Sequence, residues 1–499
     1  MKKLIEIILT KVEKSVDKLP DPFFLFLGLA ILVVIFSYIA SLVQFQAINP
    51  TNSEPIQVVN LLSKVGIQRM LTNATTNFIN FPPLGIVLIT IIGIGIAEKS
   101  GFFKTSLLTL TASVPKKLIA PVLIMISVNG SLMADSGVVL LPPLGAMLFA
   151  SYGRHPIAGL LAAFAAVCGG FSASFFITAL DPLLSSFTDA AAKTIDPSYD
   201  VFPTANYYFM LASVFVVTAV CWFVTDKIVE PALKNTETKA VDSDSEMPNP
   251  NARKAFLYGI GSVIVMSFLI LWAVFPEDGL LRDDSGTMKP LFRSIVTILM
   301  IMFAVSGIIY GYAAKTINNS KDIVRMSNDM MGTMGSYIVL VFAIGQFIAY
   351  FNDSNLGLII AVKGAELLQE LDLGRELILL SFLFFSMLVN IFISSASAKW
   401  ALLASVFVPM FMLLGISPES TQMMYRIGDS VTNFITPLFP YFPILIVFAK
   451  QFSPEITFGK LISLLLPYSF ALALIWGLMA ALWVFAGIPL GPEAPVFLD

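Results

Sequence analysis

Residues 390–442 place charged side chains and prolines inside an apolar region, and this combination limits the possible folds more than any other feature. Lys399, Arg426 and Asp429 lie among apolar segments long enough to cross a bilayer. Ionisable groups at membrane depth are costly, so they normally face a bundle interior or a water-filled cavity. Irregular backbone, which prolines such as Pro437 produce, survives there only inside protein or around such a cavity. The stretch is therefore predicted to form half of a polar site buried among membrane helices.

The composition indicates a polytopic α-helical membrane protein. Of the 499 residues, 57% are hydrophobic and 13% are charged, whereas soluble domains contain about 25% charged residues. The net charge of −3, without a basic stripe, gives no indication of nucleic-acid binding. The single histidine, His155, excludes a motif of paired histidine ligands. Cys168 and Cys221 fall in apolar segments and are predicted to be buried free thiols.

The order of apolar segments predicts an all-α fold with nine transmembrane helices and two re-entrant hairpins in an inverted repeat. A crossing needs about 20 apolar residues, and each predicted hairpin has two shorter apolar pieces around a polar tip. A span interrupted by glycine, serine or proline follows each hairpin. The predicted parts are a first repeat at 1–230 (two spans, hairpin 118–151, broken helix 156–185, span 207–229), a cytoplasmic linker at 231–254, an extra span at 255–275 and a second, inverted repeat at 291–487 (hairpin 377–414, broken helix 418–450).

Charge placement orients these segments in the membrane. Lysines crowd residues 2–18 before the first span, and the positive-inside rule places such residues in the cytoplasm. Nine crossings then leave the C-terminus in the periplasm. Residues 46–77 are predicted to be an external loop. The first interrupted span is predicted to end near Asp181-Pro182, because Asp-Pro is an ordinary helix boundary.

Inverted repeats with discontinuous helices are typical of secondary transporters. An ion channel would need a continuous polar pore, which paired closed hairpins disfavour. An intramembrane hydrolase would need a nucleophile and a base, and His155, in a predicted loop, has no evident partner. No Walker A sequence indicates ATP hydrolysis. The chain is therefore predicted not to be an enzyme.

The charged and aromatic residues of these segments allow two interpretations each. Arg426 could bind a substrate carboxylate through its guanidinium fork, or it could pair internally with Asp429 three residues on. Asp181 and Asp429 could bind a cation or carry a proton, although Asp181 could also simply end a helix. Trp400 could stack on a flat substrate ring or belong to an interfacial aromatic belt.

A set of polar side chains at the hairpin tips and helix breaks offers hydroxyl and amide oxygens. Such oxygens suit a hard cation, so a bound Na⁺ is predicted there. The alternative is that these side chains hold helices together by hydrogen bonds. The candidate Na⁺ ligands are Asn129, Ser131, Ser174, Ser394, Thr432 and Asn433.

The chain resembles the p-aminobenzoyl-glutamate transporter (AbgT) family over its full length, and three stretches carry the resemblance. They are NGSLMADSGVVLLPPLGAM at 129–147, SSASAKWALLASVFVPM at 394–410 and SPESTQMMYRIGDSVTNFITPLFPYFP at 417–443. The family's functional positions match Asp181, Trp400, Pro418 and Arg426. Asn390, Ser397 and Asp429 are candidate additions in the same motifs.

The resemblance implies a homodimer in the bacterial inner membrane that transports p-aminobenzoate-type aromatic acids. An ion-driven exporter of sulfonamides and p-aminobenzoic acid derivatives is the first expectation. A sodium-coupled importer of p-aminobenzoyl-glutamate or a related dicarboxylate is the alternative. The coupling ion, H⁺ or Na⁺, stays open, and no cofactor other than a bound Na⁺ is expected.

Overall fold

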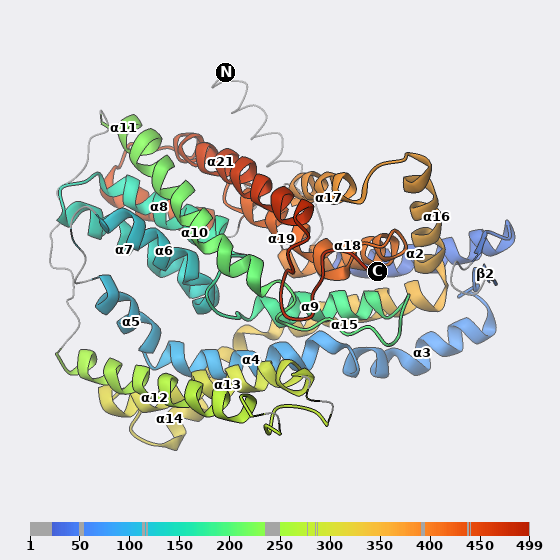
Figure 1. Cartoon of the computed structure of the whole chain (residues 1–499), viewed down its shortest axis with the longest axis horizontal. Helices are drawn as coiled ribbons and strands as arrows, with labels where there is room; N and C mark the ends of the chain where they lie inside the picture. The colour runs from blue at the N-terminus through green and yellow to red at the C-terminus, as the bar shows by residue number, and fades with distance from the viewer. Residues whose placement is uncertain are drawn as a thin grey trace.

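The computed structural model describes residues 22–48, 54–111, 115, 118–234, 250–276, 278–284, 286, 288–390, 395–436, 439 and 441–498. The described chain is almost entirely helical (Figure 1). Its one regular sheet within those residues is a short antiparallel hairpin of β1 (Gln46–Ile48) and β2 (Pro55–Gln57). Most of the predicted linker, residues 235–249, lies outside the described part.

The helices of the first half follow the predicted order of a span, a hairpin and a broken helix. Their bounds are α2 (Pro22–Leu42), α3 (Lys64–Ile79), α4 (Pro82–Lys99), α5 (Phe102–Thr111), α6 (Ile119–Val128), α7 (Ala134–Ser151), α8 (Pro156–Gly169), α9 (Leu180–Ala192), α10 (Tyr207–Val224) and α11 (Glu230–Ala232). The predicted hairpin corresponds to α6 and α7, which a 3₁₀ segment at Asn129–Met133 joins. The predicted broken helix corresponds to α8 and α9.

The second half repeats this order. Its helices are α12 (Pro250–Val274), α13 (Lys289–Ala314), α14 (Ser320–Thr333), α15 (Gly335–Asp353), α16 (Leu356–Glu370), α17 (Arg375–Asn390), α18 (Ala396–Met412), α19 (Pro418–Asn433), α20 (Phe442–Phe452) and α21 (Phe458–Phe485). Helices α17 and α18 correspond to the second hairpin, and α19 and α20 to the second broken helix. Each repeat thus has helices that stop and restart where the sequence predicted a break.

Two local predictions are wrong. Residues 46–77 are not a loop throughout, because they contain the β hairpin and most of α3. Ser63 caps the N-terminus of α3, and its side chain accepts a hydrogen bond from the amide of Gly66 at 3.1 Å. Asp181-Pro182 does not end a helix, because both residues lie in the first turn of α9. Proline fits there, since its missing N–H would have no helical partner in a first turn.

Five described helices are long and apolar enough to cross a membrane, or six if the bent pair formed by Ser320–Gly332 and Tyr337–Asp353 counts as one span. The five are Phe23–Leu42, Tyr207–Ala232, Ala252–Val274, Lys289–Ala314 and Gly459–Phe485. The fold is therefore that of a multi-pass helical membrane protein, and the count of nine spans and the re-entrance of the hairpins stay predictions.

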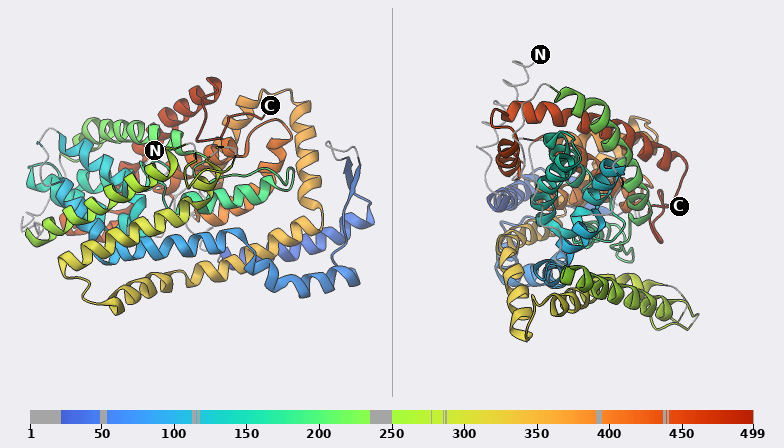
Figure 2. Two further views of the ribbon diagram at one scale, coloured as in Figure 1. Left: turned by 60° about the horizontal axis from the view of Figure 1, so that its bottom comes forward. Right: turned by 90° about the vertical axis from the view of Figure 1, so that its left-hand side faces the viewer.

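Most of the buried apolar side chains among the described residues belong to two packed clusters. The larger cluster joins the hairpins and broken helices to α2, α10, α15 and α21. The smaller one joins α4, α5, α12 and α13, which lie along one side of the molecule (Figures 1 and 2). Cys168 and Cys221 are buried and free in the larger cluster, as predicted.

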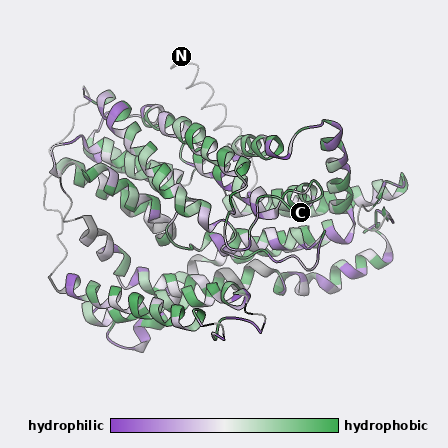
Figure 3. Cartoon of the chain, in the orientation of Figure 1, coloured by the Kyte–Doolittle hydropathy of each residue, from purple (hydrophilic) through white to green (hydrophobic). Residues whose placement is uncertain are grey.

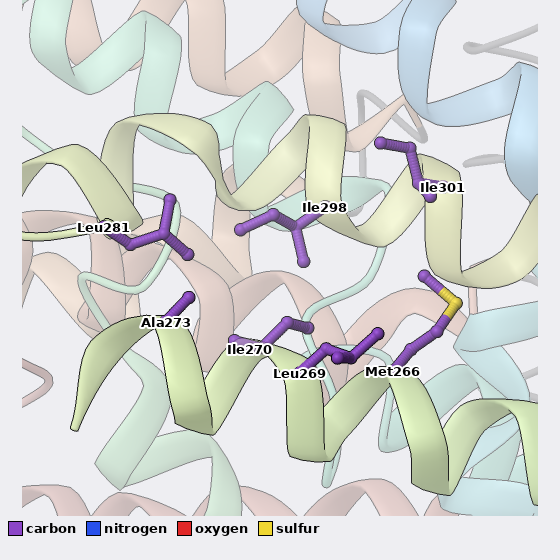
Figure 4. Close-up of a pocket in the computed structure, with 7 residues that line it drawn as sticks. All are labelled: Met266, Leu269, Ile270, Ala273, Leu281, Ile298 and Ile301. Carbon is purple, nitrogen blue, oxygen red and sulfur yellow. The ribbon is translucent and has the colours of Figure 1, made fainter. Parts of the chain in front are cut away.

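The outer helix faces are apolar, which suits contact with lipid chains. Large side chains of α12, among them Phe268 and Trp272, are exposed, and Figure 3 shows hydrophobic residues along most helices. A cavity of about 220 Å³ between α12 and α13 is equally apolar (Figure 4). Its lining consists of Met266, Leu269, Ile270, Ala273, Leu281, Ile298 and Ile301, none of which is titratable.

Helices α7 and α8 approach closely at two facing glycines. A Cβ atom added to Gly145 would lie 2.5 Å from the carbonyl oxygen of Gly159. We expect Gly145→Val to lower the free energy of unfolding by about 1–3 kcal/mol, because the helices would have to separate. The measurement is thermal unfolding in detergent. Gly477→Val in α21 is the control, since no atom lies within 4 Å of its added Cβ; equal losses in both variants would contradict the close contact.

Candidate functional site

An asparagine from each hairpin binds the break of the helix that follows it. In the first repeat, Asn129 Oδ1 accepts a hydrogen bond from the amide of Phe175 at 2.8 Å, and its Nδ2 donates to the carbonyl of Met125 at 2.9 Å. Ser174 Oγ lies 3.5 Å from the same Oδ1. Backbone groups freed where a helix breaks need such partners when water is excluded. Asn129 thus supports the interruption between α8 and α9.

Asn390 has the corresponding place in the second repeat. It ends α17, and its Nδ2 faces the carbonyl of Asp429 at 2.6 Å, Thr432 Oγ1 at 2.7 Å and Asn433 Oδ1 at 3.0 Å. The side chain is fully buried. Asn390 therefore links the second hairpin to the C-terminal end of α19, and four residues predicted as site candidates meet in one cluster.

Arg426 and Asp181 form a buried ion pair between the two repeats. Arg426 Nη1 lies 2.6 Å from Asp181 Oδ1, and the two side chains are 3% and 0% exposed. The second oxygen of Asp181 accepts hydrogen bonds from the amide of Thr178 at 2.6 Å and its hydroxyl at 2.9 Å. Within the described chain, Nε and Nη2 of Arg426 make no hydrogen bond. The guanidinium therefore keeps donors available for another acidic group.

The alternative in which Arg426 pairs internally holds, but the partner is Asp181 and not Asp429 three residues on. Asp429 instead pairs with Lys399 of α18, whose Nζ lies 2.5 Å from Asp429 Oδ1 and also donates to Asn390 Oδ1. Asn433 Nδ2 donates to the other oxygen of Asp429 at 3.2 Å. The two ion pairs together neutralise all four buried charges. A local Arg426–Asp429 pair would instead leave Lys399 and Asp181 as uncompensated buried charges.

Trp400 is fully buried beside this cluster. Its ring stacks on Tyr425 with centroids 4.5 Å apart and an interplanar angle of 23°. Its indole N–H donates to the carbonyl of Leu184 at 3.2 Å and to Thr188 Oγ1 at 3.0 Å. The ring therefore lies inside the protein, between α9 and α19, with none of its surface exposed.

The remaining candidate residues are placed as follows. Pro418 is the first residue of α19, where Ser417 caps the helix through the amide of Ser420 at 3.1 Å. Ser397 lies in the first turn of α18, and its hydroxyl contacts Ser395 Oγ at 3.4 Å. Ser131 is buried, and its hydroxyl has no hydrogen bond within the described residues. Ser394 lies outside the described residues.

Sequence reasoning missed Tyr425, Thr188 and Gln422 as members of the site, and it gave no role to Lys399. Lys399 did carry a signal, because a lysine in an apolar hairpin needs a buried partner. The other three had no such signal, since their partners come from helices far apart in the chain. Among the described residues, no group of three or more His, Cys, Asp and Glu side chains could hold a metal ion.

A multi-pass helical protein whose two repeats break their helices around buried charges belongs to the class of membrane transporters. Comparison with known proteins agrees with this class. Residues 7–498 match the model of the "AbgT putative transporter family". The chain therefore belongs to the AbgT family.

Individual relatives match nearly the whole chain. The p-aminobenzoyl-glutamate transport protein of Escherichia coli K12 is 35% identical over 486 residues, which are 96% of this chain and 95% of that protein. The crystal structure of the Alcanivorax borkumensis YdaH transporter is 38% identical, with a TM-score of 0.91, and covers 95% of this chain and 100% of its own. MtrF of Neisseria gonorrhoeae, described as one of a class of antimetabolite efflux pumps, is 38% identical, with a TM-score of 0.92, and covers 98% and 100%.

The Lys399–Asp429 pair is expected to be essential for stability. Lys399→Ala should lower the free energy of unfolding by about 3–5 kcal/mol, because it leaves Asp429 buried and unpaired. Lys399→Ala combined with Asp429→Ala should recover part of this loss. Thermal unfolding in detergent measures both effects.

The exposed pair of Lys363 and Glu366, 2.8 Å apart, supplies the control. Lys363→Ala should change the stability little, because surface ion pairs contribute at most about 1 kcal/mol. Similar losses for Lys399→Ala and Lys363→Ala would contradict the assignment of a desolvated pair.

Proposed function

We propose that this protein is an ion-driven exporter of p-aminobenzoate-type folate metabolites and of antimetabolites such as sulfonamides. One observation carries the proposal: Arg426 is buried at the junction of the two repeats with only one of its nitrogens paired, to Asp181. A buried guanidinium with free donors suits the carboxylate or ionised sulfonamide of an aromatic acid. The efflux function described for MtrF supports the direction.

The other candidate residues have distinct roles in the proposal. Trp400 supplies an aromatic surface for the substrate ring, and Pro418 fixes the start of the helix that carries Arg426. Asn390 and Ser397 hold the second hairpin tip. The proposal places the protein as a homodimer in the bacterial inner membrane, with the N-terminus cytoplasmic and the C-terminus periplasmic.

Asp181 is the proposed proton carrier. A substrate anion at Arg426 would compete with Asp181 for the positive charge of the guanidinium, so binding of the acid alters the environment of this carboxylate. If the proton and the substrate bind together, an inward proton gradient drives uptake; if they replace each other, it drives export. The exporter therefore requires that substrate binding and protonation of Asp181 exclude each other.

A second candidate is a sodium-coupled importer of p-aminobenzoyl-glutamate, which the name of the Escherichia coli relative favours. The oxygens of Asn129, Ser131 and Ser174 would hold the ion, and the buried hydroxyl of Ser131 lacks a hydrogen bond within the described residues. Bound sodium would supply a positive charge close to the acidic substrate. Thr432 and Asn433 fit this role less well, because their cluster already contains the Lys399 ammonium.

Arg426→Ala is expected to reduce substrate flux by about 10- to 100-fold, since a hydrogen bond to a charged group contributes about 1.5–3 kcal/mol. The measurement is flux of labelled p-aminobenzoate, p-aminobenzoyl-glutamate and a sulfonamide in proteoliposomes, with pH and sodium gradients imposed separately. Arg293→Ala is the control, because Arg293 pairs with Asp200 at the exposed end of α13. Undiminished flux in folded Arg426→Ala protein would disprove the anchor.

Whether substrate binding releases protons or takes them up distinguishes an exporter from an importer. Addition of substrate to weakly buffered, purified protein should release protons if the two exclude each other, and the release should vanish in Asp181→Asn. A pH indicator records the change. Proton uptake on substrate binding would rule out the exchange mechanism. A flux that depends on the sodium gradient and is unchanged in Asp181→Asn would favour the importer.

A further inference from the structure

Helices α9 and α19 are joined by polar contacts at two positions along their lengths. The first is the ion pair of Asp181 and Arg426. The second lies seven residues along α9, where Thr188 Oγ1 donates to Gln422 Oε1 at 2.5 Å. Gln422 precedes Arg426 by four residues, so both side chains lie on the same face of α19. The two helices therefore run antiparallel, with Thr188 about two turns after Asp181 on α9 and Gln422 about one turn before Arg426 on α19.

The hydroxyl of Thr188 also holds the indole of Trp400. It accepts the indole N–H at 3.0 Å, while its single hydrogen is shared between Gln422 Oε1 at 2.5 Å and the carbonyl of Leu184 at 2.9 Å. The three side chains are 0%, 0% and 1% exposed. Thr188 thus fixes the edge of the indole, and Tyr425 covers one face of the ring.

The orientation of Gln422 is determined at its other end. Its Nε2 donates to Asn206 Oδ1 at 2.8 Å, and Asn206 Nδ2 donates to the carbonyl of Glu419 at 2.9 Å. The carboxamide oxygen therefore faces Thr188 and cannot exchange places with the nitrogen without the loss of both bonds. This buried chain of hydrogen bonds connects the indole to the loop that precedes α10, and each of its links is satisfied.

We propose that Thr188 and Gln422 are positioning residues that fix the plane of the Trp400 ring relative to Arg426 and thereby select aromatic acids. The inference rests on the proposed function, in which Trp400 and Arg426 bind the ring and the acid of one substrate. Helix α19 carries Gln422, Tyr425 and Arg426 together, so one rigid element relates the aromatic surface to the cation. If the Trp400 ring could rotate freely, it would not keep a fixed orientation relative to Arg426.

The test compares Thr188→Val, which keeps the shape and removes the hydroxyl, with Thr188→Ser, which keeps the hydroxyl. Thr188→Val should raise the KM for p-aminobenzoyl-glutamate by about fivefold, the effect of one lost hydrogen bond, with the maximal rate within about twofold. Thr188→Ser should retain the KM of the unmodified protein. Gln422→Met should act like Thr188→Val and provides a second variant if the first does not fold.

A spectroscopic measurement separates positioning from general disruption. The protein contains five tryptophans, and 5-fluorotryptophan labelling with Trp400→Phe as reference identifies the ¹⁹F resonance of Trp400. Thr188→Val should shift this resonance and leave the others in place, whereas Thr188→Ser should not. An unmoved resonance, or a moved one with an unchanged KM, would overturn the inference. If the unmodified protein transports none of the three compounds, the proposed function fails, and the ¹⁹F spectra still decide whether Thr188 holds the ring.

Discussion

Lys399, Asp429, Arg426 and Asp181 bury four charges in a region that excludes water, and each charge must be compensated where it lies. Helix α19 supplies one member of each pair. Every residue of this helix is buried although many of them are polar, so its place in the core depends on polar partners from α9, α17 and α18. These three helices and α19 lie near the middle of the molecule (Figure 1). The arrangement of both repeats around α19 follows from this requirement.

The breaks in the helices follow from the same exclusion of water. A helix that stops inside the protein leaves backbone groups that need partners, and Asn129 and Asn390 supply them from the preceding hairpins. Each asparagine therefore couples the position of a hairpin to the geometry of the break beside it. The two contacts are alike in kind even though the sequences around them share few residues, and the inverted repeat itself stays a prediction.

The sequence predicted the pairs of short helices in each repeat, because apolar length, glycine and proline are local signals. It also predicted that Asp181, Asn390, Arg426 and Asp429 lie in buried polar surroundings. It could not predict which charge pairs with which: the spacing of Arg426 and Asp429 on one helix favoured a local pair, while the actual partners come from α9 and α18. The polar residues of 46–77 favour a loop although many of them lie on the surface of α3, and Asp181-Pro182 fits a helix start as well as the predicted helix end.

Burial also determines how strongly the binding of a ligand at Arg426 is coupled to the protonation or pairing of Asp181. A buried carboxylate that loses its partner costs about 3–5 kcal/mol, which is comparable to the free energy of binding of a millimolar ligand. An acid that takes the guanidinium therefore binds only if Asp181 finds a proton, a cation or a second bond from the same arginine. Arg426 has the unpaired nitrogens for the last solution, and in that case the acid and the carboxylate share one cation. A proton on Asp181 would accompany the substrate, whereas exchange of substrate for a proton requires Asp181 to stay ionised and to share Arg426 with the acid, so the coupling is contained in this one ion pair.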